Sequence, residues 1–530
     1  MIEGGASLSA LVRQSGRQRP DAPAVVAGGR RLSWGDLDRA VDRAAAGYVA
    51  QGLAPGDRVA VQLPNGIDWL RAALGALRAG LVVVPLNTAY TGPELEYVLT
   101  DSGAALFVTG AERVPVAGVR MCVGPPDADG PPPEVPDDPA ALSFLAYTSG
   151  TTGRPRGAML TAGALRANQQ QCLAMSPPPV REDDKVLLVL PLFHVYGLNA
   201  GFGLVAATGA CAVLEESFDP HGSLALMAEE AVTAVPGAPP MFQAWLAMAD
   251  AAGNDAELRR GFAAMRMASS GAAPLPEEVW TAMRERAAVT VWEGYGLTEA
   301  SPVVASTLAT GRAKPDCIGG PLPGVELALR DTAAMGTFDD ESGGGEAADD
   351  ALDSASDSAS DKPSDKPSDG DSDGEEGPGE IWVRGPNLFA GYWPDGVDGP
   401  GADGWLRTGD LAYRDGDGDL HLVDRRSDLI LVSGFNVYPA EVERVLDAHP
   451  AVAESAVIGV PDPRTGSAVR AVVVTAPGEK TTFEELQAYA AESLARYKVP
   501  TSVNFLPALP HSLTGKVSRA RLRELGLTGD

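Results

Sequence analysis

RVAVQLPNGIDWLRAALGALRAGLVVVPL, residues 58 to 86, is the stretch that decides the fold class. Its two ends are short apolar runs, and between them apolar residues from Ile67 to Leu77 recur at the spacing of one helix face. Gly80 comes directly after this helical pattern, where a glycine commonly ends a helix. The stretch therefore predicts a strand, a helix and a second strand, the βαβ unit from which parallel sheets are built.

Further short runs of the same kind extend this sheet along the chain. ALFV at 105–108, KVLLVL at 185–190 and ACAVL at 210–214 are apolar on both faces, which is typical of buried parallel strands. Residues 413–426, YRDGDGDLHLVDRR, predict a hairpin. A chain of 530 residues exceeds the roughly 250 to 300 residues of a single core, so more than one domain is expected.

We expect an α/β protein with two unequal domains. A large N-terminal domain of mixed α/β subdomains spans residues 1–424, and a small α+β domain spans residues 425–530. Within the first, residues 339–376 hold 15 acidic residues against two lysines and almost no large apolar residue. Such a segment cannot bury enough apolar surface to offset its ordering entropy, so the composition predicts a disordered acidic insertion.

Charge and cysteine content exclude several classes of protein. The formal net charge of −29 leaves no broad basic face, so nucleic acid is not an expected partner. The four cysteines are far apart in sequence and contain no CxxC pair, which indicates neither a zinc site nor a disulfide framework. The chain shows no signal peptide and no membrane-spanning run, so we expect a cytoplasmic protein.

The most specific local signal is YTSGTTGRPRG at 147–157, a loop of hydroxyls, glycines and arginines that follows an apolar run. Glycines let the backbone approach a polyphosphate, while hydroxyls and exposed N–H groups supply donors. Read without context, such a loop is equally compatible with a plain surface turn, and it is not the GxxxxGK[ST] phosphate loop. As a complete string it resembles the phosphate-binding signature of the adenylate-forming, or AMP-binding, superfamily, in particular its fatty acyl-CoA synthetases and acid–CoA ligases.

Other motifs of that family recur in order along nearly the whole chain. PLFHVYGLNAG at 191–201 is similar to the segment beside the acyl pocket, SSGAAPLP at 269–276 to the adenine-binding turn, and WEGYGLTEASP at 292–302 to the segment that contacts adenine, phosphate and metal. Matching segments continue through GEIWVRGPNLFAGYW, WLRTGDLAYRDGDG and VDRRSDLILVSGFNVYP to LTGKVSRARLREL at the C-terminus. The resemblance implies an enzyme that uses ATP and Mg²⁺ to activate a carboxylic acid as acyl-AMP and then passes the acyl group to the thiol of CoA.

The resemblance also assigns roles to single residues in the nucleotide site. Glu299 and the loop hydroxyl of Thr151 would hold Mg²⁺ through hard oxygen ligands, Tyr295 would stack on adenine, and Asp410 with Arg425 would bind the ribose. Arg156 stands where the family usually has lysine, which keeps the charge and permits bidentate phosphate contact. The remaining residues expected to bind the nucleotide are Thr148, Ser149, Gly150, Thr152, Gly153, Gly271, Ala272, Ala273, Gly296 and Thr298.

In the C-terminal domain the resemblance implies a mobile element with two functional faces. Lys516, in LTGKV, matches the lysine that bridges acyl carboxylate and α-phosphate, and Gly434 matches the glycine that lines the pantetheine tunnel. In relatives the domain rotates between the two half-reactions about an Asp or Lys hinge, and Ser427 occupies that position here. Outside a motif, each of these residue types is ordinarily a surface or turn residue.

His194 and the stretch TAVPGAPPMFQAW at 233–245 bear on the acid. His194 is a candidate for shaping the carboxylate end of the acyl pocket, and the stretch carries no charge, which favours a fatty or other apolar acid. Pro239, Met241 and Phe242 are equally compatible with pocket wall and with core. Two alternatives stay open: a ligase that loads a separate acyl carrier protein, and an amino-acid adenylating enzyme.

Overall fold

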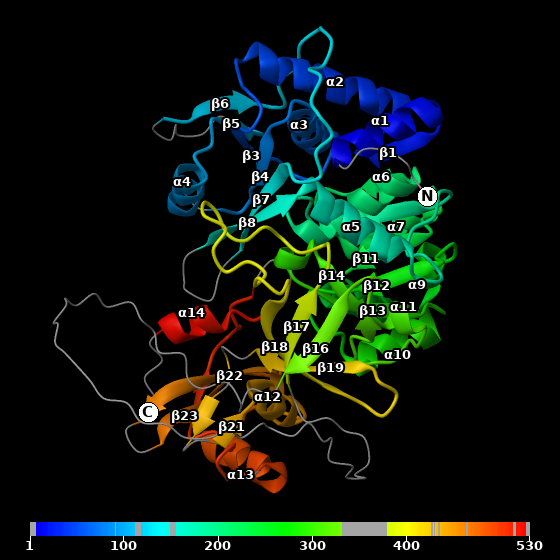
Figure 1. The fold of residues 1–530 in the computed structure, drawn as a ribbon. Coiled ribbons are helices and arrows are strands. Elements are labelled where there is room, and N and C mark those ends of the chain that lie inside the picture. Colours follow the sequence, from blue (N-terminus) through cyan, green and yellow to red (C-terminus); the bar gives the residue numbers. More distant parts are fainter. Residues whose placement is uncertain are drawn as a thin grey trace, which may run out of the picture.

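The computed structural model describes residues 7–90, 92–111, 118–148, 155–330, 379–425, 428, 430–432, 435–462, 465–494, 496–511 and 516–525. The acidic segment 339–376, predicted to be disordered, lies outside these residues. The helices α1 (Leu8–Gln18), α2 (Trp34–Ala50) and α3 (Ile67–Arg78) lie at one end of the molecule, and the C-terminal part, orange and red in Figure 1, lies at the other. Among the described residues no helix has the length and apolarity needed to cross a membrane.

The βαβ unit predicted from residues 58–86 is confirmed. β3 and β4 pair in parallel and are joined by α3, whose Trp69, Leu70 and Leu74 are buried. Gly80, just past the helix, has a φ of +74°, the left-handed conformation in which glycine is favoured. The sheet that contains them has the order β6 (Arg120–Val123), β5 (Leu106–Thr109), β3 (Arg58–Gln62), β4 (Val82–Pro85), β7 (Leu142–Thr148), β8 (Arg156–Thr161). Only the last of these pairings, β7 with β8, is antiparallel.

A second, nine-stranded sheet carries the runs predicted at 185–190 and 210–214 as parallel strands. Its order is β15 (Gly320–Pro321), β14 (Val303–Ser306), β13 (Val291–Gly296), β12 (Met267–Ser270), β11 (Ala234–Gly237), β9 (Lys185–Leu188), β10 (Cys211–Leu214), β1 (Pro23–Ala27), β2 (Arg30–Ser33). The strands from β13 to β1 are parallel. Their carboxyl ends meet at one edge, where α/β proteins place ligands.

A third, antiparallel sheet contains the predicted hairpin. Its order is β16 (Glu326–Arg330), β17 (Gly379–Arg384), β18 (Leu406–Arg414), β19 (Leu420–Arg425). The strands of the C-terminal part form another sheet: β21 (Phe435–Val437), β20 (Ile430–Val432), β23 (Gly466–Thr475), β22 (Val452–Asp462) and β24 (Ser502–Phe505). The boundary at 424/425 stays a prediction, and the chain passes from one sheet to the other between Arg425 and Ile430.

The remaining helices have recognisable ends. In the N-terminal part they are α4 (Gly92–Asp101), α5 (Ala162–Leu173), α6 (Leu204–Thr208), α7 (Pro220–Glu230), α8 (Pro239–Ala252), α9 (Ala256–Gly261), α10 (Glu277–Arg286) and α11 (Thr307–Thr310). In the C-terminal part they are α12 (Pro439–Asp447), α13 (Phe483–Ser493) and α14 (Arg519–Glu524). Thr161 caps α5 and Thr482 caps α13, each accepting a backbone N–H in the first turn.

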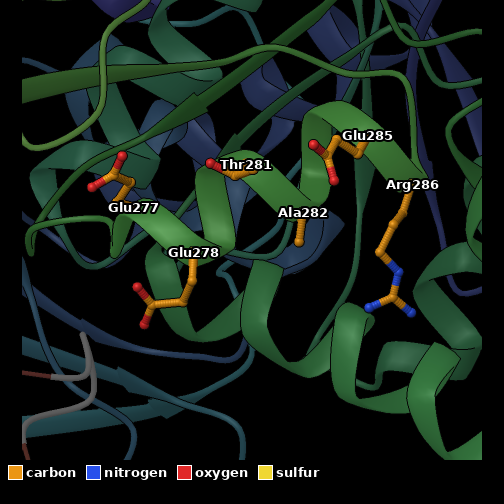
Figure 2. A pocket seen from close by; sticks show the side chains of 6 residues that line it. All are labelled: Glu277, Glu278, Thr281, Ala282, Glu285 and Arg286. Carbon is orange, nitrogen blue, oxygen red and sulfur yellow. The ribbon is translucent and has the colours of Figure 1, made fainter. Parts of the chain in front are cut away.

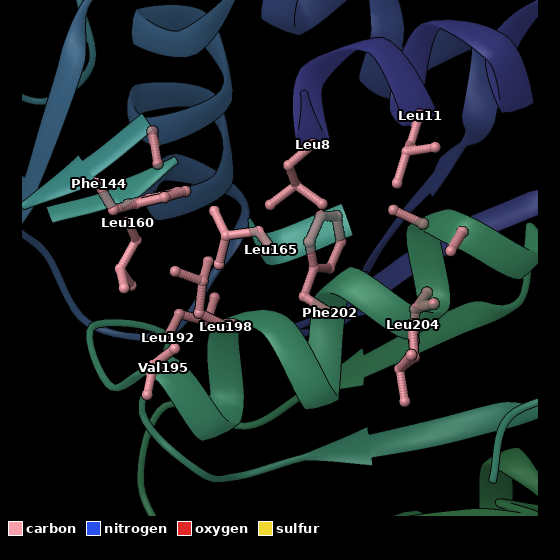
Figure 3. Packing of buried hydrophobic residues seen from close by; sticks show 14 of the residues in the cluster. Leu8, Leu11, Phe144, Leu160, Leu165, Leu192, Val195, Leu198, Phe202 and Leu204 are labelled. Carbon is pink, nitrogen blue, oxygen red and sulfur yellow. The ribbon is translucent and has the colours of Figure 1, made fainter. Parts of the chain in front are cut away.

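The main core joins the two parallel sheets. Figure 3 shows Phe144 and Leu160 of the six-stranded sheet beside Leu165 of α5, facing Leu198 and Phe202. The last two belong to η1 (Tyr196–Gly203), an eight-residue π-helix. π-Helical turns are rare and occur often at functional sites. This one begins two residues after His194.

Candidate active site

The predicted phosphate loop connects two paired strands. β7 and β8 are antiparallel neighbours, and Thr148 stands opposite Arg156, so both ends of the loop are held in one hairpin. The Tyr97 hydroxyl donates a hydrogen bond to the Pro155 carbonyl at 3.0 Å, which fixes the chain where it leaves the loop. The loop residues Ser149, Gly150, Thr151, Thr152 and Gly153 lie outside the described residues, so the role of Thr151 stays a prediction.

Glu299 and Arg156, far apart in sequence, are brought together by a residue that the motifs did not single out. The Tyr392 hydroxyl donates a hydrogen bond to Glu299 Oε1 at 2.5 Å. The Arg156 guanidinium lies over the ring of the same tyrosine, 3.8 Å from its centroid, and donates to Asp398 Oδ2 at 2.7 Å. A half-buried carboxylate thus lies near the exit of the phosphate loop, with a cation beside it.

Buried amides fix the turn that carries Glu299. Thr298 and Glu299 form a short 3₁₀ turn, η2 (Thr298–Ala300). The side-chain amide of Asn387 donates to the Ala300 carbonyl at 2.8 Å, and that of Asn199 donates to the Ser301 carbonyl at 2.6 Å. Both asparagines are buried. Because an unpaired buried amide is costly, these bonds hold the backbone after Glu299 in one conformation.

The predicted adenine turn leaves the carboxyl end of β12. Gly271 is close to a second aromatic residue, since a Cβ added there would lie 3.2 Å from the Tyr196 ring. Ala272 has a φ of +71°, a strained conformation for a residue with a Cβ. With Ala273 these residues form an irregular turn at the sheet edge where β13 also ends.

Tyr295 and Asp410, predicted to bind adenine and ribose, are in direct contact. The Tyr295 hydroxyl donates to Asp410 Oδ2 at 2.6 Å, and both side chains are buried. Arg425 stands opposite Asp410 in the β18–β19 pairing, which places its backbone at the same point. Gly296 follows on β13, where a Cβ would lie only 2.2 Å from the Pro302 carbonyl oxygen, so the chain requires glycine there.

A buried glutamate beside this turn was not predicted. Glu293, on β13, accepts the backbone N–H of Leu275 through Oε2 at 3.2 Å. Burial raises the pKa of Glu293 to about 8, so its carboxyl is protonated at neutral pH. The bond ties the end of the adenine turn to the strand that carries Tyr295. A glutamate in a β-strand sequence gives no signal for such a role.

His194 is a neutral imidazole with a defined tautomer. Its Nδ1 accepts the backbone N–H of Tyr196 at 3.2 Å, so the proton is on Nε2, which is left as a donor. Burial, together with the positive charge of Lys516, lowers the pKa of His194 to about 4 from its usual value near 6.5. Lys516 itself is exposed. The C-terminal lysine and the histidine of the N-terminal domain are therefore close enough to interact electrostatically.

This pKa gives a pH prediction. Folding favours the neutral imidazole, so the stability that His194 contributes is complete above its unfolded pKa near 6.5 and is lost as the pH falls towards 4. His194 should not titrate between pH 6 and 8. We expect the rate of pyrophosphate release to follow the same pH profile over that range in wild type and in His194→Gln. A wild-type inflection near 6.5 that the variant lacks would contradict the assignment.

The three residues considered as pocket wall are buried, and two hollows lie away from the predicted site residues. Met241 and Phe242, on α8, belong to a buried core cluster, and Pro239 at the start of the same helix is buried as well, so of the two open interpretations the structure favours core. The hollow in Figure 2 runs along α10 and is lined by that helix alone, by Glu277, Glu278, Thr281, Ala282, Glu285 and Arg286, none of which is a predicted site residue. A small cavity of about 20 Å³ is lined by Pro179, Val180, Ala200, Ala234, Val235, Pro236, Met267 and Ser269.

Three aspartates of the β18–β19 hairpin form salt bridges with basic side chains of the same chain. Asp415, Asp417 and Asp419 lie close enough to share a metal ion. Lys314, however, binds Asp415 and Asp417, and Arg312 binds Asp419 through two hydrogen bonds of 2.8 and 2.9 Å. The cluster is accounted for as a set of salt bridges.

Comparison with known proteins identifies the family of the chain. Residues 12–346 match the AMP-binding enzyme family, and residues 441–516 match the AMP-binding enzyme C-terminal domain. The feruloyl-CoA synthase of Amycolatopsis is 37% identical over 518 residues, covering 96% of each chain. The long-chain-fatty-acid–CoA ligase of Bacillus subtilis is 31% identical over 570 residues, covering 98% of this chain and 94% of the relative.

Solved structures of other proteins match this fold over nearly the whole chain. ATP-bound MatB from Rhodopseudomonas palustris has a TM-score of 0.81 at 29% identity, covering 98% of this chain and 99% of that chain. The O-succinylbenzoate coenzyme A synthetase of Bacillus subtilis, in complex with ATP and a magnesium ion, has a TM-score of 0.79 at 27% identity, covering 97% of this chain and 99% of that chain. The chain therefore belongs to the AMP-binding enzyme family and is an AMP-forming acid–CoA ligase.

Proposed function

We propose that this ligase uses ATP and Mg²⁺ to convert an uncharged, apolar carboxylic acid to its acyl-AMP and then transfers the acyl group to CoA. The observation that carries the proposal is the joint contact of Glu299 and Arg156 with Tyr392 at the exit of the phosphate loop, which places a carboxylate suited to a metal beside a cation suited to phosphate. The charge of Lys516 also reaches the buried His194, whose Nε2–H is a donor. Two anions, the acid and the α-phosphate, must meet in the first half-reaction. Fixed donors and cations at the meeting point are what that step requires.

The nucleotide would bind at the carboxyl edge of β12 and β13. Tyr295 and the turn from Gly271 to Ala273 would enclose the adenine, and Asp410 would accept the ribose hydroxyls. The contact between Tyr295 and Asp410 supports this, since it fixes the phenol and the carboxylate relative to each other before ATP arrives. Arg425 would meet the same ribose.

The residues present fit a magnesium ion near the phosphates. Glu299 supplies a hard carboxylate oxygen, and Thr151 would add a hydroxyl, leaving the remaining positions to phosphate and water. A bound Mg²⁺ would neutralise charge on the phosphates. Arg156, held beside Tyr392, would contact the same polyphosphate.

The first step would be an in-line displacement at the α-phosphorus. The acid is already ionised at neutral pH, so no general base is needed. Lys516 would bridge the acyl carboxylate and an α-phosphate oxygen, and the Nε2–H of His194 would donate to the carboxylate. One carboxylate oxygen bonds to phosphorus while the bond to the bridging oxygen breaks, and pyrophosphate leaves with that electron pair.

An uncharged tail is supported by the stretch TAVPGAPPMFQAW at 233–245, which contains no charged side chain. An amino-acid substrate would leave its ammonium group without a carboxylate here. The CoA step would follow a rotation of the C-terminal domain, with Gly434 lining the thiol path and Ser427 at the hinge position, and both residues lie outside the described ones.

The test is a panel of acids followed with and without CoA. Purified protein, ATP and Mg²⁺ are incubated with ferulate, benzoate, octanoate, palmitate and an amino acid, and pyrophosphate and thioester are measured, the latter by mass spectrometry. We expect acyl-CoA with apolar acids and no turnover of the amino acid. Accumulation of acyl-AMP without thioester would instead indicate a ligase that loads a carrier protein, and turnover of the amino acid alone would refute the apolar assignment.

A further inference from the structure

Residues 389–399, here called the 389–399 loop, are attached to the strand that leaves the phosphate loop. The Met159 N–H donates to the Gly391 carbonyl at 3.1 Å, and the Trp393 N–H donates to the Gly157 carbonyl at 2.8 Å. Met159 and Gly157 both belong to β8, so both hydrogen bonds join the loop to that strand. The 389–399 loop therefore lies along β8 as a neighbouring strand would, directly after Arg156.

The 389–399 loop is closed on itself by its own backbone. The Tyr392 N–H donates to the Val397 carbonyl at 3.0 Å, and the Gly396 N–H donates to the Tyr392 carbonyl at 2.8 Å. Gly391 has a φ of +100°, and a Cβ there would lie 2.1 Å from the Gly396 carbonyl oxygen. Only glycine fits this turn, so the sequence builds a tight loop with Tyr392 at a fixed position.

Tyr392 contacts two charged groups of the active site with different parts of its side chain. Its hydroxyl binds Glu299 Oε1, and its ring face carries the Arg156 guanidinium. Phe389 packs edge-on against the ring with a centroid distance of 5.0 Å, and its backbone N–H donates to the Glu299 carbonyl at 2.9 Å. The 389–399 loop thus holds Glu299 at both its backbone and its side chain.

We propose that Tyr392 is a positioning residue that holds the carboxylate of Glu299 and the guanidinium of Arg156 in a fixed relation for binding Mg²⁺·ATP. A carboxylate has two oxygens, and the hydrogen bond at Oε1 fixes the group, so that Oε2 would be the oxygen to bind a cation. The ring holds Arg156 through a cation–π contact, and Asp398 fixes its far end. The charges are therefore ordered before the nucleotide binds, which lowers the entropy cost of binding.

The inference rests on the proposed role of Glu299 at the metal, and two variants separate its two parts. Tyr392→Phe removes the hydroxyl and keeps the ring, while Tyr392→Leu removes both. The measurement is calorimetric binding of the unreactive analogue α,β-methylene-ATP over a range of Mg²⁺ concentrations, which requires no turnover. Tyr489→Phe is the matched control, since it removes a tyrosine hydroxyl bond of 3.2 Å to Ala448 in the C-terminal domain.

We expect Tyr392→Phe to raise the Mg²⁺ concentration for half-maximal binding by roughly tenfold, the usual worth of a hydrogen bond to a charged group. Tyr392→Leu should, in addition, weaken binding at saturating Mg²⁺ by about threefold, because Arg156 loses the aromatic ring that its guanidinium contacts. The control should match wild type. A KM for the acid that stays constant in Tyr392→Phe would agree with a role confined to the nucleotide side.

Glu299→Gln distinguishes the two ways to fail. If Glu299→Gln changes the Mg²⁺ dependence and Tyr392→Phe does not, the positioning role is wrong while the proposed function stands. If neither variant changes it, Glu299 does not act on the metal, and the inference fails with that assignment. Should Tyr392→Leu not fold, as judged by circular dichroism, Tyr392→Phe alone decides.

Discussion

Lys516→Ala is expected to slow acyl-AMP formation by roughly a hundredfold or more, the usual cost of removing one charged transition-state contact. In the proposed mechanism Lys516 lies where the two anions meet, and its charge reaches His194. Its loss would therefore remove a positive charge from that point. Thioester formation from supplied acyl-AMP should survive, because that half-reaction does not assemble the same pair of anions. Pyrophosphate release and thioester yield, measured separately, check this.

Lys498→Ala is the matched control for this prediction. Lys498 lies in the same C-terminal part and forms an ion pair of 2.7 Å with Glu441. Its contacts among the described residues do not include His194. Its replacement should leave both half-reactions near the wild-type rate. An equal loss of both half-reactions in Lys516→Ala, or no loss in either, would show that Lys516 does not have the proposed role.

Glu299→Gln is the second substitution with a large expected effect. The amide keeps the size of the side chain and a hydrogen bond to Tyr392 but removes the negative charge that a hard cation requires. We expect pyrophosphate release at millimolar Mg²⁺ to fall by about a hundredfold. Part of the loss should be recovered at higher Mg²⁺ concentration, because the phosphates and water still supply ligands.

Glu326→Gln serves as the control for Glu299→Gln. Glu326 is an exposed carboxylate on β16 that pairs with Arg384, and surface pairs of this kind contribute little. The activity of the Glu326→Gln variant should remain near wild type at all Mg²⁺ concentrations. A Glu299→Gln variant that behaved in the same way would remove Glu299 from the metal site.

The fold was predictable wherever one segment carries a complete pattern. Residues 58–86 predicted β3, α3 and β4, and residues 413–426 predicted the β18–β19 hairpin, because apolar periodicity and turn glycines are local properties. The order of strands in the nine-stranded sheet was not predictable in this way. It pairs β1 with β10, segments far apart in the sequence that no local pattern connects.

The site was predictable to the extent that its residues lie in motifs. The structure brings Tyr295 into contact with Asp410, and the charge of Lys516 reaches His194, while the roles that the motifs imply for these residues remain proposals. Tyr392 was missed, although its segment GEIWVRGPNLFAGYW was part of the resemblance. Its contact with Glu299 spans 93 positions of sequence, and a tyrosine after a glycine has no pattern that specifies a partner.

The protonation states could not be predicted from sequence either. His194 is neutral because it is buried near a cation. Glu293 holds a proton because the effect of burial exceeds that of the hydrogen bonds that stabilise its charged form. Both properties depend on packing between segments. Gly434 and the loop residues from Ser149 to Gly153 lie outside the described residues, so only their motifs support their assignments.

The attachment of the 389–399 loop to β8 also bears on solubility. β8 is the terminal strand of the six-stranded sheet, and a strand in that position presents free N–H and C=O groups to which another chain can pair. The backbone bonds from Gly157 and Met159 to the 389–399 loop occupy part of that edge. Variants that loosen the loop should therefore lose monodispersity on storage before they lose secondary structure, because an aggregation-prone edge is uncovered while the rest of the sheet remains intact.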